Sequence, residues 1–160
     1  MKLQYRQIIE YLTAAAGRVS QPDEPAKPLL AELLAADGMP TEAAVRLRTI
    51  RDDLQRHANI FTEQRDAILA KHNARIDEAA QAIVPADLPE EPTEEETEAA
   101  AARLNAANTE IAKLLEAQVE GIRTIRASTL TPATGDAYTL LLTDRRIDWL
   151  WPIITDDLPK

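Results

Sequence analysis

The chain has 160 residues, a length that is typical of a single domain with a substantial buried core. It contains no cysteine, which excludes disulfides and thiolate metal sites, and its few aromatic residues predict an aliphatic core. The net charge of −9 argues against binding to nucleic-acid backbones, because that binding needs basic side chains that neutralise phosphates.

The N-terminal sequence lacks the continuous apolar stretch and the small-residue cleavage site of a signal peptide. No apolar run reaches the roughly 18–20 residues that are needed to span a bilayer. We therefore expect a cytoplasmic protein that does not interact with membranes.

The first predicted helix covers residues 3–16, with an apolar side that includes Tyr5 and Ile8, and Gly17 as its stop. Residues 17–27 have the composition of a loop. Pro28 can open a short helix over residues 29–37, because a missing N–H costs nothing in the first turn of a helix.

A long helix is predicted from Pro40 to about Ile83, and it would be roughly 66 Å long at helical rise. Neither glycine nor a further proline interrupts it. The acid precedes the base by four residues in the pairs Asp52/Arg56 and Glu42/Arg46, which is the stabilising order. The apolar positions recur at a helical period, at Leu47, Ile50, Leu54, Phe61, Ile68, Ile76 and Ile83.

Residues 84–93 form a connection rich in proline and glutamate, and its three prolines exclude a helix. Thr93 and Glu96 then have the spacing of a capping box, which predicts the start of a second long helix over about residues 94–118. A short connection between long helices makes them antiparallel neighbours. We therefore expect residues 94–118 to pair with the C-terminal half of the first long helix.

The pattern changes after Val119, and residues 119–127 fit either a bent helix end or a short extended segment. Thr131 and Pro132 resemble a helix cap, and a last short helix is expected from Arg145 to Trp151. The predicted fold is therefore mainly all-α: one helical domain over residues 1–160, built on a long antiparallel helical hairpin with short helices at both ends.

Searches for catalytic motifs give negative results, and we expect no catalytic residue, cofactor or metal site. Asp53 and His57 share a helix face and could supply part of a metal site, but a surface pair is the simpler interpretation. The best enzyme hypothesis is a metal-dependent nucleotide hydrolase with carboxylates on neighbouring helices. Its carboxylates would be the pairs Glu95/Glu98 and Glu63/Asp66.

Two groups of side chains are candidates for binding. Arginine suits the capture of carboxylates and phosphates, so arginines brought together by folding could form an anion or nucleotide site. Tryptophan is enriched at interface hot spots, although a tryptophan-rich tail can also simply cap the core. The candidate partner contacts are Arg46, Arg48, Arg51, Trp149 and Trp151, and the candidate anion contacts are Arg123, Arg126, Arg145 and Arg146.

The runs MPTEAAVRLR at residues 39–48, FTEQRDAIL at 61–69 and EIAKLLEAQV at 110–119 resemble small acidic proteins that tailed phages and prophages encode. The resemblance covers most of the chain. It implies a phage accessory protein without an assigned activity, located in the host-cell cytoplasm or in the virion.

Taken together, these patterns predict a non-enzymatic protein that acts by contact with a phage protein, a host protein or a second copy of itself, as a virion component, assembly factor or adaptor. The alternative is an anti-defence inhibitor that sequesters a small nucleotide or blocks a host protein. Nucleic acid is not an expected partner, since the seven acids of residues 87–98 stand without a base among them.

Overall fold

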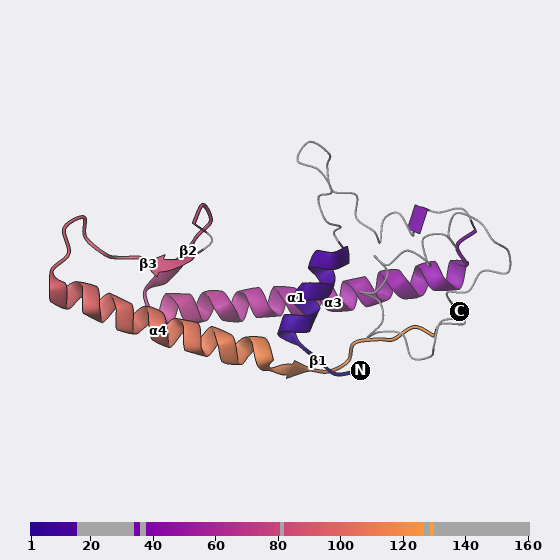
Figure 1. The fold of residues 1–160 in the computed structure, drawn as a ribbon. Coiled ribbons are helices and arrows are strands. Elements are labelled where there is room, and N and C mark those ends of the chain that lie inside the picture. Colours follow the sequence, from indigo (N-terminus) through magenta and orange to yellow (C-terminus); the bar gives the residue numbers. More distant parts are fainter. Residues whose placement is uncertain (16–33, 36–37, 81, 127–128, 130–160) are drawn as a thin grey trace. The chain divides into compact units, whose positions relative to one another are not determined.

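The computed structural model describes residues 1–15, 34–35, 38–80, 82–126 and 129. Within them the protein is mainly helical, with two small antiparallel sheets of two strands each (Figure 1). The chain divides into two compact units. Unit 1 comprises residues 1–57 and 118–160, and unit 2 comprises residues 58–117. Unit 2 is thus inserted, in the sequence, between the two parts of unit 1.

The first predicted helix is present, with a strand in place of its first turn. β1 (Leu3–Gln4) leads directly into α1 (Tyr5–Ala15). The side chain of Gln7 accepts a hydrogen bond from the backbone N–H of Gln4 at 2.9 Å, which satisfies a donor ahead of the first helical turn. The strand forms because Leu3 and Gln4 pair with residues 118–119. The local spacing of apolar residues could not predict this pairing with a distant segment.

The long helix begins where the sequence predicts, since α3 covers Thr41–Lys71 immediately after Pro40. The predicted end near Ile83 is wrong. Asn73 adopts a φ of 47°, a left-handed conformation that cannot continue an α-helix and that asparagine tolerates better than most residues.

A β-hairpin occupies the segment that was predicted to extend the helix. β2 (Ala74–Asp77) pairs with β3 (Ala82–Pro85), and Ile76 lies opposite Ile83. The seven-residue spacing of these two isoleucines fits a helix as well as a hairpin, which explains the wrong boundary. Asp77 Oδ1 accepts hydrogen bonds from the N–H groups of Ala79 and Ala80 in the turn that follows β2.

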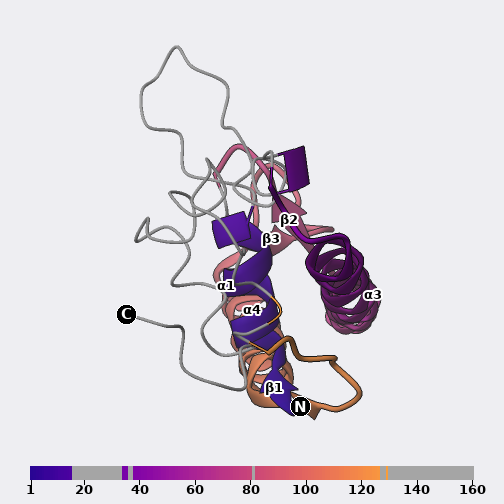
Figure 2. The same cartoon turned by 90° about the vertical axis from the view of Figure 1, so that its right-hand side faces the viewer.

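The second long helix agrees closely with the prediction: α4 spans Glu94–Glu116. Its capping box is confirmed, because the Thr93 hydroxyl accepts from the Glu96 N–H at 3.2 Å and Glu96 Oε2 accepts from the Thr93 N–H at 2.8 Å. The hairpin of β2 and β3 packs on α4 (Figure 2).

Two alternatives were open for residues 119–127, and over residues 119–126 the structure has the extended one. β4 (Gln118–Val119) pairs antiparallel with β1, so that Val119 lies opposite Leu3. Residues 120–124 continue without a helix. We call residues 118–126 the strap.

Unit 1 has a closely packed aliphatic core. Apolar side chains from β1, α1, the first half of α3 and the strap are almost fully buried. They include Leu3, Tyr5, Ile8, Ala43, Leu47, Ile50, Leu54, Ile122 and Ile125.

The buried apolar side chains of unit 2 are fewer, and three of the five are alanines. Phe61 and Leu69 come from α3, Ala74 comes from β2, and Ala100 and Ala107 come from α4. No described helix is both long enough and apolar enough to cross a membrane. The predicted cap at 131–132 and the last helix at 145–151 lie outside the described residues, as do 17–27 and most of 29–37.

Candidate functional site

A buried carboxylate is the most distinctive polar group of unit 1. Asp53 is 4% exposed although it lies on α3 beside Asp52, whose side chain is 65% exposed. An unpaired charge in such a place would be strongly destabilising. The groups that pair with the Asp53 carboxylate therefore determine whether its charge is tolerated in the core.

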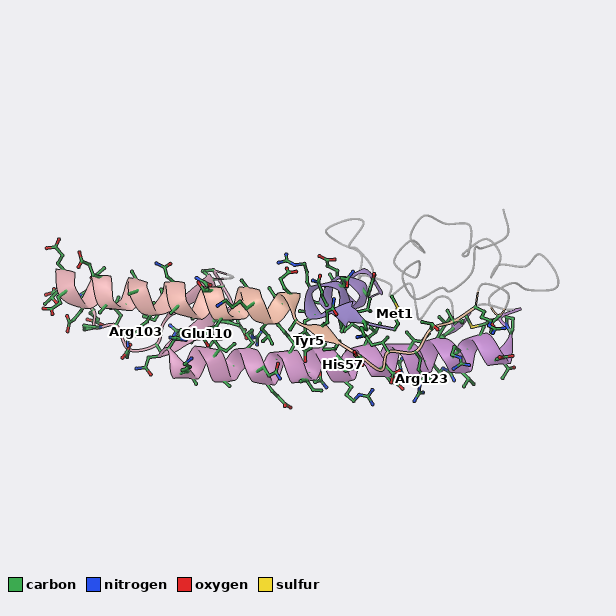
Figure 3. All side chains as sticks on the ribbon, turned by 90° about the horizontal axis from the view of Figure 1, so that it is seen from below. Met1, Tyr5, His57, Arg103, Glu110 and Arg123 are labelled. Atoms are coloured by element: carbon green, nitrogen blue, oxygen red, sulfur yellow. The ribbon has the colours of Figure 1, made fainter. Side chains whose placement is uncertain are left out.

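Two segments satisfy the Asp53 carboxylate. Oδ1 accepts a hydrogen bond from Arg56 Nη2 at 3.2 Å, one turn further along α3. Oδ2 accepts from the backbone N–H of Arg123 in the strap at 3.3 Å, and Arg123 Nε lies 3.7 Å from the same oxygen. Figure 3 shows Arg123 beside α3. Asp53 thus joins α3 to a segment 70 residues away in the sequence.

This pairing differs from the predicted one. Asp52 was expected to pair with Arg56, but Arg51 donates to Asp52 at 2.9 Å and Arg56 turns to Asp53 instead. The shift of partner follows from burial, because a buried carboxylate gains more from an arginine than an exposed one does.

The metal hypothesis for Asp53 and His57 receives no support from the geometry. Both oxygens of Asp53 already accept hydrogen bonds from Arg56 and Arg123. His57 Nε2 is buried and has no hydrogen-bond partner. Among the described residues, no group of three or more histidine, aspartate or glutamate side chains could hold a metal ion. The hydrolase hypothesis, with its pairs Glu95/Glu98 and Glu63/Asp66, stays a prediction. Among the described residues, these pairs do not belong to a cluster that could bind a metal ion.

Unit 2 has a second polar centre, at Glu110 of α4 (Figure 3). Its Oε1 accepts a hydrogen bond from Lys71 Nζ at 2.7 Å and lies 3.0 Å from His72 Nε2. Hydrogen bonds from Lys71 and then His72 lower the pKa of the Glu110 carboxyl group, which therefore stays ionised to a lower pH than an ordinary glutamate. This centre fastens the C-terminal end of α3 to the C-terminal third of α4.

A third contact fixes the connection that precedes α4. Asp87 accepts from Arg103 Nη2 at 3.2 Å and from Asn73 Nδ2 at 3.4 Å. The acidic connection is thereby tied both to α4 and to the residue that ends α3.

The three candidate partner arginines of α3 do not form one cluster. At about 100° per residue, Arg48 and Arg51 lie roughly 60° apart around the helix, and Arg46 lies about 140–160° from both. All three are exposed, and Arg51 is paired with Asp52. They remain candidates for separate contacts.

The candidate anion contacts have partly different surroundings. Arg123 is exposed, but its Nε lies 3.7 Å from Asp53 Oδ2, so its charge is partly neutralised by that carboxylate. Arg126 is exposed. The remaining candidates, Arg145, Arg146, Trp149 and Trp151, lie outside the described residues.

Sequence reasoning missed the structural roles of Asp53 and Glu110. The available signal for Asp53 was its position next to the apolar stripe, since it directly precedes Leu54. No local signal marks Glu110, because its partner Lys71 is 39 residues away.

Comparisons of the chain with protein-family models, with curated proteins and with solved structures found no match.

Proposed function

We propose that this protein is a non-enzymatic accessory protein of a tailed phage that acts by binding another protein, as a virion component, assembly factor or adaptor. The observation that carries the proposal is the incomplete burial of α4, and the resemblance of the sequence to small acidic phage proteins agrees with it.

Most of the apolar side of α4 is incompletely buried. Only Ala100 and Ala107 are buried among its 23 residues. The larger side chains of Leu104, Ile111 and Leu115 lie on the same side of the helix but are only half-buried. Aliphatic side chains in unit 1 reach 2% exposure or less. Contact with a second copy or with another phage protein would bury this stripe.

We also propose that α4 and the C-terminal half of α3 form the antiparallel hairpin that the sequence predicts. The contacts of Lys71 and His72 with Glu110 support it, and so does the fixed connection at Asp87. Such a hairpin would present the half-buried stripe of α4 along one edge.

The experiment measures molar mass by light scattering, on the protein alone and after mixing with proteins from infected cells. The wild-type protein is compared with two matched variants. Leu104→Gln makes the half-buried stripe polar, and Ala102→Gln adds the same side chain at an exposed position of α4. We expect only Leu104→Gln to reduce association, with circular dichroism showing that both variants are folded. A wild-type protein that stays monomeric and captures no partner would refute the proposal.

A second candidate function is supported by the distribution of charge. Unit 2 holds five basic and thirteen acidic side chains, a net charge of −8, whereas unit 1 holds thirteen and fourteen, a net charge of −1. Almost the whole charge of the protein is therefore in the inserted unit. Such a field favours association with a basic protein surface, as an anti-defence inhibitor that blocks a host protein requires.

Two double variants separate this candidate from the first. Glu90→Gln with Glu91→Gln removes two exposed charges from unit 2, and Glu10→Gln with Glu42→Gln removes two exposed charges from unit 1. If a basic host protein is the partner, added salt weakens the capture of that protein from a lysate. The Glu90→Gln/Glu91→Gln variant weakens the capture further, whereas the Glu10→Gln/Glu42→Gln variant does not. Capture that is insensitive to both salt and variant would exclude this candidate.

A further inference from the structure

The strap is held differently from the rest of unit 1. Gln118 and Val119 pair with β1, Ile125 forms an isolated β-bridge, and residues 120–124 have no regular secondary structure. Nevertheless, Ile122 and Ile125 are each 2% exposed. The strap therefore contributes large side chains to the core although its residues 120–124 lie outside any helix or sheet.

Three polar contacts anchor the strap to distant parts of the chain. The N-terminal amino group of Met1 donates to the Ile122 carbonyl oxygen at 3.0 Å, and Asp53 Oδ2 accepts from the Arg123 N–H at 3.3 Å. Lys2 pairs with Glu120 at the surface, where both side chains are exposed. Of these three anchors, only the Asp53 carboxylate is buried, so it is the one least screened by water.

Asp53 does not depend on the strap alone. Its other oxygen is held by Arg56, which belongs to the same helix and would stay in place if the strap left. Opening the strap therefore would not strand an unpaired charge on α3. The Arg123 N–H that is released would bond to water.

Gly121 provides a pivot in the strap. Its φ is +85°, which is accessible to glycine and strained for other residues, while an added Cβ would meet nothing within 4 Å. Substitution there perturbs the conformation of the strap without a steric clash against the core.

We propose that the strap is a cover that opens and closes on α3 as one unit while the helices stay folded, and that Asp53 is the positioning residue that holds it closed. Residues 120–124 of the strap lie outside helices and sheets, and such segments open at lower free energy than core helices do. This device belongs to unit 1 and is independent of the proposed contact surface on α4. It gives unit 1 a closed state and an open state that differ in the exposure of Ile122 and Ile125.

The test is amide hydrogen exchange of the full chain, with Asp53→Asn compared with Asp52→Asn. The two variants remove the same charge from adjacent positions of α3, but only Asp53 touches the strap. We expect Asp53→Asn to accelerate exchange in residues 119–125 at least tenfold, with little change in α3 and unit 2. Equal acceleration throughout unit 1, or no acceleration in the strap, would overturn the proposal.

Two further measurements keep the proposal testable if Asp53→Asn does not fold. In the wild-type protein, the Arg123 amide should exchange through an opening with a weaker urea dependence than that of Leu54 in α3. Identical urea dependences would overturn the proposal, because they indicate that the two residues open together. Gly121→Ala should make trypsin cleave after Arg123 at least several-fold faster, and an unchanged rate of cleavage would count equally against it.

Discussion

Lys71 Nζ donates a hydrogen bond to Glu110 Oε1 at 2.7 Å, which joins the last residue of α3 to the C-terminal third of α4. His72 Nε2 lies 3.0 Å from the same oxygen. The Glu110 carboxylate thereby holds the C-terminal end of α3 against α4 within unit 2.

This contact predicts how stability depends on pH. The pKa of Glu110 is held below its ordinary value of 4.5 in the folded protein, by the Lys71 hydrogen bond first and the His72 hydrogen bond second. The stabilisation is therefore complete above pH 4.5 and is lost as the pH falls through the lower, folded-state pKa. We expect Glu110→Gln to lower the urea midpoint at pH 7 and to have a smaller effect near pH 3. An equal effect at both pH values would contradict the pairing.

The capping box predicts an asymmetry between two threonines of the same segment. Thr93→Ala removes the side chain that accepts from the Glu96 N–H and should lower the free energy of unfolding by about 1 kcal/mol. Thr109→Ala, in the middle of α4, should be neutral or slightly stabilising, because its hydroxyl bonds only to the Asn105 carbonyl and alanine is the better helix former. Urea denaturation measures both, and an equal loss would show that the cap contributes nothing.

The core of unit 1 predicts a contrast between two positions on α3. Leu54 is 1% exposed, and Leu54→Ala should cost about 2–5 kcal/mol because it removes buried methyl groups and leaves a cavity. Val45 is 58% exposed, and Val45→Ala should change stability by less than about 0.5 kcal/mol. Thermal unfolding followed by circular dichroism measures both changes. A large loss in Val45→Ala would mean that this side chain is covered in solution.

The end of α3 predicts an effect of backbone conformation at Asn73. With a φ of 47°, Asn73→Gly should be well tolerated, whereas Asn73→Ala should be about 1–2 kcal/mol less stable than Asn73→Gly. Both variants lose the hydrogen bond to Asp87, so their difference reports only the backbone. If the two variants were equally stable, the left-handed conformation would not be what ends the helix.

Much of the fold could be predicted because its signals are local. Pro40 and the apolar period after it set the start of α3, and Thr93 with Glu96 set the start of α4, through hydrogen bonds between residues three or four apart. The hairpin of β2 and β3 could not be predicted in the same way. Ile76 and Ile83 have a spacing that suits both structures, and only pairing across the turn distinguishes them.

The candidate site shows the same division. Arg46, Arg48 and Arg51 are exposed, as candidate partner contacts must be, but the helix distributes them around its axis. Arg123 was predicted to bind an anion, but the sequence does not indicate that the Asp53 carboxylate would pair with its guanidinium.

The sequence by itself therefore determined where helices begin, that the core is aliphatic and that disulfides are absent, since composition and short-range hydrogen bonding decide these properties. The tertiary structure decided where α3 ends, which carboxylate is buried and which unit carries the charge. These depend on contacts such as Asp53 with Arg123, across 70 residues, and Lys71 with Glu110, across 39. The physical reason is that a helical period specifies which face of a helix is apolar, whereas the segment that covers this face is selected by the packing of the whole chain.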